Sequence, residues 1–335
     1  MIGNPFPLKQ NAGKSFQGSI VLGKGFVLSP EEAEALIAKD LRNKDVLFPY
    51  LNGDDLNNNP EQKASRWVIN FFDWSEERAR TYPDCFEIIE RLVKPERQRW
   101  KVDENGKELV GTYALRKPLP QKWWIYGEKR PALYETISQL DQVMAINRNT
   151  KHLLLDFQPS RNIIFTDSIV VIAFETYFDF AILSSVVHEV WAWKHSSTKG
   201  SATLRYSGGK AFEAFPFPSR NNNADTVRLA QSLSDFRKSI TANNQIGLTD
   251  LYNLVHSQSY NGDLEDYLIQ IRQIQIAIDK DIIKAYEWED IQLRHNFYEL
   301  EYLPENDRTR FTIHPDARKE ILKRLLQLNH ELHHN

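Results

Sequence analysis

The chain has 335 residues, of which 41% are apolar and 26% charged, with a formal net charge of −3. These values are ordinary for a folded globular protein and exclude a disordered chain. A single cysteine, Cys85, excludes an intramolecular disulfide and a cysteine-based zinc site within one chain. With no apolar run of 18 residues and no secretory signal at the N-terminus, we expect a cytoplasmic protein of about two domains that crosses no membrane.

The first two thirds of the chain alternate short strand-like runs with turns. Runs of β-branched and aromatic residues predict strands over residues 18–22, 25–28, 46–51, 67–72, 123–126, 142–147, 163–165, 169–174, 202–206 and 211–215. Ser29 and Pro30, followed by two glutamates, are typical of a helix start, and Asn52-Gly53-Asp54 is typical of a turn. Residues 76–93 and 179–195 carry helical patterns.

The sequence changes character near residue 220, after the polar run 219–224. Beyond it, the spacing of apolar residues predicts helices over 225–240, 249–256, 263–286 and 315–330. We therefore predict an α+β fold. Residues 1–220 would form a domain of mixed and antiparallel strands with flanking helices, and residues 221–335 an all-helical domain.

Positive charge is concentrated in one segment. Residues 91–130 carry 11 basic and 5 acidic side chains, although the whole chain is slightly acidic. A basic face on a near-neutral body is typical of phosphate binding, and a solvated charge run fits the count equally well. The candidates for phosphate contacts are Arg97, Arg99, Lys101, Lys122, Lys129 and Arg130. Trp123 and Trp124 would point to opposite faces of a strand, so that one lies in the core. The other, taken as Trp123, would flank DNA, and packing under a loop fits the sequence at least as well.

Two loops carry side chains suited to base readout. Bidentate groups such as arginine on guanine read base edges in the major groove. Residues 148–152 follow a predicted strand and offer Arg148 and Lys151. Residues 196–205 follow a predicted helix, have the small polar composition of a binding loop, and offer Lys199, Thr203 and Arg205. His188 and His195 on the preceding helix fit packing or capping better than ligand binding.

The chain lacks the sequence motifs of a methyltransferase and of a nucleotide-binding site. A methyltransferase needs a Gly-rich turn after a strand for its cofactor and an Asn/Asp-Pro-Pro-aromatic loop for its target amine, and the sequence has neither. Gly23-Lys24-Gly25 lacks the third glycine and the helix of a nucleotide site. We therefore expect no catalytic residue, no metal and no bound cofactor in this chain.

Two further patterns suggest enzymes and carry less weight. His330-Glu331-Leu332-His333-His334 has zinc-protease spacing, but it lies in the last six residues, where a fraying helix end is the better interpretation. Asp54, Glu61 and Lys63 distantly resemble the site of a metal-dependent nuclease, in a run of Asn, Asp and Pro that favours a solvated loop.

Several segments together resemble a known family. They are residues 15–23, 43–56, 66–71, 93–97, 123–126, 205–207 and 215–218, and in the helical part 251–254, 279–288, 310–311 and 317–330. They are similar to the target recognition domain and C-terminal helical region of class I, S-adenosylmethionine-dependent N6-adenine DNA methyltransferases. These enzymes are related to type IIG and type IIL (MmeI-like) restriction-modification enzymes, with a TaqI-like specificity domain.

This resemblance implies sequence recognition on double-stranded DNA rather than catalysis. In the family a cofactor-binding methyltransferase domain precedes these segments, and no part of this sequence matches it. S-adenosylmethionine is accordingly expected in that separate domain or subunit, which would be the protein partner. Residues 196–205 would act as in type I specificity subunits, where a helix and a loop precede a Phe-Pro motif like that at 215–218.

Three hypotheses remain from the sequence. The first, which we favour, is a DNA recognition module that docks to a methyltransferase. The second is a protein interaction module built on the helical part without DNA binding, and the third is a small metal-dependent nuclease. Salt-dependent DNA binding would separate the first from the second, and magnesium-dependent cleavage would reveal the third.

Overall fold

The structure is a computed structural model that describes residues 3–200, 202–219 and 223–334. The strands are β1 Ser15–Gln17, β2 Val27–Leu28, β3 Leu47–Leu51, β4 Arg66–Ile69, β5 Trp100–Val102, β6 Glu108–Tyr113, β7 Gln142–Asn147, β8 Asn149–Thr150, β9 Leu155–Pro159, β10 Ile164–Phe165, β11 Ile169–Ile172, β12 Ser197–Lys199, β13 Thr203–Arg205, β14 Asn296–Glu299 and β15 Thr309–Thr312. The α-helices are α1 Pro30–Lys39, α2 Gly53–Asn58, α3 Glu76–Ala79, α4 Pro83–Leu92, α5 Lys94–Arg97, α6 Pro131–Ile137, α7 Tyr177–Ser184, α8 Val186–His195, α9 Ala224–Asn244, α10 Leu248–Val255, α11 Glu265–Ala285 and α12 Pro315–His334.

Two four-stranded sheets organise the strand-rich part. The central sheet has the antiparallel order β1-β11-β7-β9, and the second has the order β10-β3-β4-β2, in which only the pair β10–β3 is parallel. Strands β12, β13 and β8 form a smaller antiparallel sheet. Short helices flank these sheets, and long helices dominate the chain after residue 223, so the α+β prediction is confirmed.

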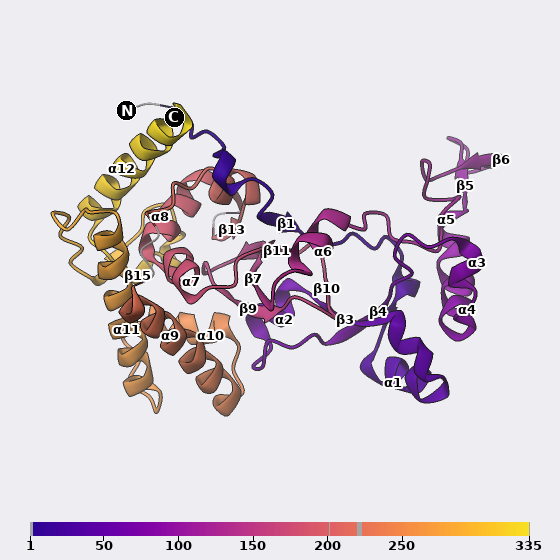
Figure 1. Ribbon diagram of the computed structural model, residues 1–335, viewed down its shortest axis with the longest axis horizontal. Helices are drawn as coiled ribbons and strands as arrows, with labels where there is room; N and C mark the ends of the chain where they lie inside the picture. The colour runs from indigo at the N-terminus through magenta and orange to yellow at the C-terminus, as the bar shows by residue number, and fades with distance from the viewer. Residues whose placement is uncertain (1–2, 201, 220–222, 335) are drawn as a thin grey trace.

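The molecule is elongated, and its parts follow one another along the long axis (Figure 1). The long helices lie at one end, the central sheet in the middle, and the lobe with α1, α3 and α4 at the other end. The β5–β6 hairpin projects beyond α5 with no other element beside it. The two chain ends lie close together at the helical end.

The apolar core divides into three clusters that do not follow the predicted boundary at residue 220. One belongs to the end lobe and includes Phe26, Val68 and Trp123, and a second lies under the central sheet around Phe165. The largest cluster joins residues such as Phe180 and Trp191 to Leu233 and Ile282. The core is therefore shared across residue 220, which itself lies outside the described residues, and the division into two domains stays a prediction.

Local sequence signals account for several helix starts. Ser29 caps α1 in a reciprocal capping box with Glu32, as the Ser-Pro-Glu-Glu sequence predicts. Asn52 forms the same kind of box with Asp55, so the segment predicted to be only a turn instead begins α2. The helix predicted over 179–195 is two helices, because Ser185 is extended between α7 and α8.

Three predicted strands are wrong. The run 18–22 follows β1 and contains only isolated bridges, at Ser19 and Ile20. Residues 123–126 form a turn whose four side chains are all buried, because hydrogen bonds to main-chain carbonyls bind Trp124 and Tyr126 into the lobe. Residues 211–215 lie largely in a π-helical turn, Gly208–Glu213, capped by the Ser207 side chain. Apolar runs of this length mark burial, and they do not by themselves distinguish a strand from a buried turn.

No helix in the described parts of the chain combines the length and the apolar character needed to cross a lipid bilayer.

Candidate nucleic-acid interface

Arg148 and Arg205 come together at the edge of the central sheet. Arg148 follows β7, and its carbonyl accepts a hydrogen bond of 2.8 Å from the amide of Tyr206, the residue after β13. Strand β13 pairs with β8, with Arg205 opposite Asn149. Two loops far apart in sequence are thus held side by side by main-chain hydrogen bonds, and both had been chosen from the sequence as base readers.

The two arginines line one hollow of about 410 Å³. Its walls are Ser15, Phe16, Gln17, Arg148, Val170, Ser197, Arg205, Tyr206, Ser207, Gly208 and Gly209. We call this the arginine hollow. A side-chain carbon on Gly208 would lie 2.6 Å from Ser15 Oγ, so glycine is needed there for the close approach to β1. The adjacent glycines Gly208-Gly209 are a sequence signal for this site, and they were not among the predicted site residues.

The arginine hollow is rich in hydrogen-bond donors and is lined by two guanidinium groups. Burial and then the neighbouring Arg205 lower the pKa of Arg148. Within the described chain neither guanidinium forms an ion pair with a carboxylate, whereas Gln17 already donates to the Asp167 carbonyl at 2.9 Å. A site of this kind suits a ligand with acceptor atoms and negative charge, such as a phosphate or the O6/N7 edge of guanine.

The β12–β13 hairpin carries two more predicted site residues beside the arginine hollow. Lys199 is exposed and pairs across the hairpin with half-buried Thr203. Gly200, with φ of 67°, lies in the turn, while Ser201 lies outside the described residues. The hairpin therefore holds Lys199 and Thr203 on the same two strands as Arg205, which is opposite Ser197, and their contact with DNA stays a prediction.

Lys129 and Arg130 lie near this site and are already paired. Lys129 Nζ is 2.7 Å from Asp73 Oδ1, and an Arg130 nitrogen is 2.7 Å from Glu128 Oε2. Arg130 also donates to the Gly18 carbonyl, and Gly18 follows Gln17 of the arginine hollow. Its charge contributes to lowering the pKa of Arg148, which places the two side chains in one electrostatic environment.

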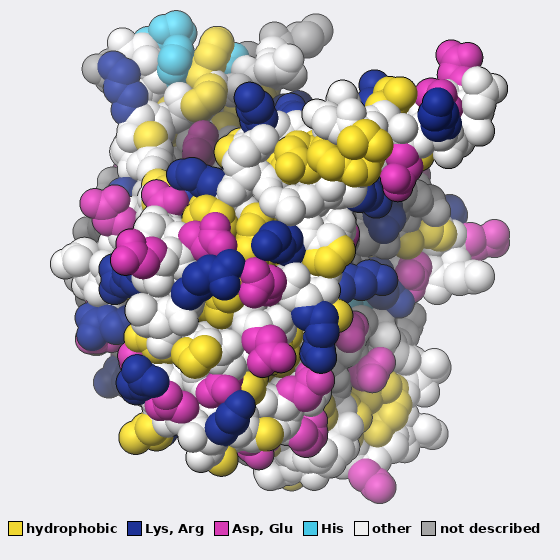
Figure 2. Space-filling view, turned by 90° about the vertical axis from the view of Figure 1, so that its right-hand side faces the viewer, with side chains coloured by type: hydrophobic (Ala, Val, Ile, Leu, Met, Phe, Trp, Pro, Cys, Tyr) yellow, Lys and Arg dark blue, Asp and Glu magenta, His cyan; other side chains and the backbone are white. Residues whose placement is uncertain are grey.

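Arg99, Lys101 and Lys122 are exposed in the lobe at the far end of the molecule. Arg99 and Lys101 belong to or adjoin β5, and Lys122 lies in the turn that contains Trp123. Figure 2 looks onto that end and shows Lys and Arg interspersed with Asp and Glu, with hydrophobic side chains gathered in a band near the top. These three residues remain candidates for phosphate contacts, but the structure does not place them in the arginine hollow.

Arg97 is a structural residue, and the predicted phosphate contact is wrong for it. Its side chain is 1% exposed and donates to the carbonyls of Leu22 at 3.0 Å, Ile125 at 2.7 Å and Val21 at 2.7 Å. Burial lowers its pKa to about 10. A basic count along the sequence cannot distinguish such a core arginine from a surface one.

Trp123 is likewise part of the core rather than a DNA contact. It is 2% exposed, packs edge-on against Phe86 at 5.3 Å, and has the Lys94 ammonium 5.0 Å from its ring centre. The prediction failed because it assumed a strand with alternating faces, whereas the segment is a buried turn.

Lys151 is separated from the other predicted base readers. Its ammonium is 2.7 Å from Asp307 Oδ1, and it lines a different surface hollow with Asn253, His256 and Arg310. The neighbouring His152 turns inward and binds the Asn253 side chain at 2.9 Å. Only Arg148 of this loop therefore faces the arginine hollow.

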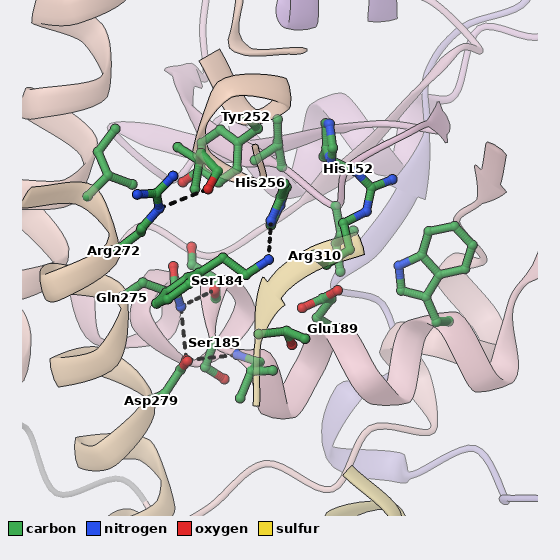
Figure 3. Close-up of a pocket in the computed structure, with 18 of the residues that line it drawn as sticks. His152, Ser184, Ser185, Glu189, Tyr252, His256, Arg272, Gln275, Asp279 and Arg310 are labelled. Carbon is green, nitrogen blue, oxygen red and sulfur yellow. Dashed lines mark hydrogen bonds between the residues drawn. The ribbon is translucent and has the colours of Figure 1, made fainter. Parts of the chain in front are cut away.

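A polar cavity of about 70 Å³ lies between α8, α10, α11 and β15 (Figure 3). Asp279 accepts from the Val186 amide at 2.9 Å, from Gln275 at 2.9 Å and from His295 at 2.8 Å. Arg272 donates to the Val255 carbonyl at 2.9 Å. These hydrogen bonds join helices from both sides of residue 220, so we interpret the cavity as a structural junction.

The remaining histidines and carboxylates lie elsewhere. His188 is buried against Tyr206, with 2.9 Å between Nε2 and the hydroxyl, and His195 packs on Trp191. His333 stacks on Phe6 at the end of α12. Lys63 pairs with Glu61 at the surface, and Asp54 accepts from Asn58, so the three residues of the nuclease hypothesis do not converge on one point. The described residues contain no group of three or more histidine, cysteine or acidic side chains placed to hold a metal.

Comparison with known proteins bears directly on the segment that holds the arginine hollow. The family model described as "MmeI, target recognition domain" matches residues 11–219. The chain belongs to this family. Every wall of the arginine hollow falls within the matched part of the MmeI target recognition domain.

The MmeI fold extends over the helical part as well. A chain from the structure described as "Structure of Type IIL restriction-modification enzyme MmeI in complex with DNA has implications for engineering of new specificities" aligns over 100% of this chain, with a TM-score of 0.62. The sequence identity is 14%, and this chain spans 37% of the length of that chain. A search of curated proteins found no match.

Proposed function

We propose that this chain recognises a specific sequence in double-stranded DNA as the target-recognition part of a restriction-modification system. Membership of the MmeI target recognition domain family supports this function. The observation that carries it at the level of residues is the arginine hollow, where two guanidiniums without carboxylate partners, among the residues described, stand beside an exposed hairpin. Arginine in such a setting binds phosphates or guanine edges.

Binding of the 335-residue chain to a library of random duplexes, followed by sequencing of the bound fraction, tests this proposal. We expect one enriched motif. The logarithm of the binding constant should fall linearly with the logarithm of salt concentration, with a slope of about −0.9 for each phosphate neutralised and roughly four phosphates in contact. Absence of both enrichment and salt-dependent binding would contradict the proposal and favour a protein interaction module.

We further propose that the methyl group is transferred by a separate domain or subunit, which would bind S-adenosylmethionine and dock to this chain. The sequence basis is the lack of a Gly-rich cofactor turn and of the Asn/Asp-Pro-Pro-aromatic loop. Calorimetric titration of the chain with S-adenosylmethionine should give no binding isotherm. One-site binding at micromolar affinity would place the cofactor in this chain instead.

A further inference from the structure

Leu22 and Phe72 combine two features that are rarely found together. Both have left-handed backbone, with φ of 53° and 51°, and both are large apolar residues at the surface, 50% and 40% exposed. Left-handed backbone is costly for a bulky side chain, and an exposed apolar side chain gains little burial in return. The other described non-glycine residues with positive φ are polar or charged.

The surrounding structure fixes both backbones in this conformation. Arg97, itself buried, donates to the carbonyls of Val21 and Leu22. The Phe72 amide donates to Asn70 Oδ1 at 2.9 Å, and the turn closes with a 3.0 Å hydrogen bond from the Trp74 amide to the Phe71 carbonyl. Strain that is imposed by such contacts is found preferentially at functional sites.

Segment 127–130 connects the surroundings of both residues to the arginine hollow. Leu22 packs against Gly127 so closely that any side chain there would collide with it. Phe72 precedes Asp73, which binds Lys129. Arg130 then donates to Gly18, next to Gln17 of the arginine hollow.

The chain itself covers Phe72 only in part. Its ring contacts Phe48 at 5.7 Å and Trp74 at 5.4 Å between ring centres, which supports the ring from below and leaves its outer part free. Cationic side chains lie close by: Lys129 and Arg130 pair with Asp73 and Glu128, and Lys122 acts on Asp73 without a carboxylate at ion-pair distance among the described residues. An apolar tip beside cations is complementary to a base stack flanked by phosphates.

We propose that Leu22 and Phe72 are wedges that enter the base stack of the duplex beside the segment contacted by the arginine hollow. Binding would then unstack a base step and bend the DNA. This inference rests on the proposed function, and it adds sequence-dependent deformability as a second source of specificity, since pyrimidine–purine steps open most easily.

The test uses the full chain and a duplex containing its enriched motif, with 2-aminopurine placed in turn at each position. Wild type should raise 2-aminopurine fluorescence at one or two adjacent steps, because unstacking relieves quenching. Leu22→Asn and Phe72→Asn should abolish that rise and weaken binding by about tenfold, since stacking on an aromatic side chain contributes on that scale. Phe72→Leu, which keeps an apolar tip, should retain most of the signal.

The thermal stability of the variants distinguishes a side chain that enters the DNA from one that packs within the protein. Asparagine adopts left-handed backbone readily, so Leu22→Asn should unfold at the same temperature as wild type or higher. Gln245→Asn is the matched control, because Gln245 also has positive φ but caps α9 at the helical end, so its substitution should leave binding unchanged.

Three outcomes would overturn the wedge and leave the proposed function intact. In the first, wild type binds its motif with no change in 2-aminopurine fluorescence. In the others, the asparagine variants bind the duplex as tightly as wild type, or these variants lose only their association with a methyltransferase polypeptide. Failure of wild type to bind any duplex would instead contradict the proposed function itself.

Discussion

Arginine has contrasting roles in this chain, and its surroundings decide which role each residue plays. Arg97 and Arg237 are 1% and 2% exposed and donate to main-chain carbonyls, whereas Arg205 is exposed and Arg148 lies beside it in the arginine hollow. The sequence indicated Arg148 and Arg205 as base readers on two separate loops, and the structure brings both side chains to one hollow. It could not separate Arg97 from them, since the burial of Arg97 depends on contacts with residues 28 to 76 positions away.

Removal of Arg97 should destabilise the fold. In Arg97→Met the carbonyls of Leu22 and Ile125 lose their donor, and that of Val21 keeps only the longer hydrogen bond from the Gly127 amide. We therefore expect the free energy of unfolding to fall by roughly 3 kcal/mol. Urea denaturation measures this change. DNA affinity per folded molecule should stay the same; a variant of unchanged stability that binds DNA less tightly would return Arg97 to the phosphate-contact class.

Arg205 should determine sequence preference rather than affinity alone. An arginine on guanine discriminates by about 1–3 kcal/mol, because a wrong base leaves its donors unpaired. In Arg205→Ala, and in Arg148→Ala, we expect the enriched motif to relax or shift at one position. Lys151→Ala is the control, because Lys151 pairs with Asp307 outside the arginine hollow. An unchanged motif with weaker binding at every site would show that the two arginines contact phosphates.

Elements with end signals were predicted better than elements without them. Ser29 and the glutamates after it marked α1, and the strand β7 was predicted with its observed bounds. Residues 123–126 and 211–215 were misassigned because both are short apolar runs whose burial comes from tertiary contacts. The arginine hollow was predicted only as two separate loops, since the pairing of β13 with β8 joins them through space.

Helix α9 shares its apolar core with β9 of the central sheet. Ser234 donates to Asp156 Oδ1 at 2.8 Å, and Arg237 donates to the Leu155 carbonyl at 2.6 Å, so α9 is bound to β9 by buried polar contacts. A fragment of residues 1–219 would expose the apolar surface that α9 and α11 cover. We expect this fragment to lack a cooperative thermal transition, as calorimetry would detect; cooperative folding would instead establish residues 1–220 as an independent domain.

The whole molecule should lose stability on mild acidification. Burial lowers the pKa of His152 to about 3 and of His188 to about 3. Below pH 6.5 the unfolded chain takes up protons at both residues and the folded chain does not, so stability falls as pH decreases. By pH 5.5 each histidine should contribute a loss of about 1.4 kcal/mol.

Denaturation in urea at pH 7.5 and pH 5.5 measures this loss. Burial raises the pKa of Glu189, which favours the folded state as pH falls and reduces the total. His188→Gln should therefore be compared with wild type, and its stability should depend less on pH. Equal pH dependence in the two proteins would show that His188 can be protonated in the folded state.

The two ends of the chain are fastened to each other. Asn329 on α12 accepts from the Phe6 amide and donates to the Phe6 carbonyl, each at 2.8 Å, and Phe6 stacks on His333. The order of segments is thus not essential to the fold, and a circular permutant should be viable. Its old ends would be joined by a short linker, and new ones opened between Asn105 and Gly106 in the exposed β5–β6 turn. A methyltransferase fused to one of the new ends would lie at the opposite end of the long axis of the molecule. The distance between the recognised sequence and the methylated base would then show whether the position of the fused enzyme sets that distance.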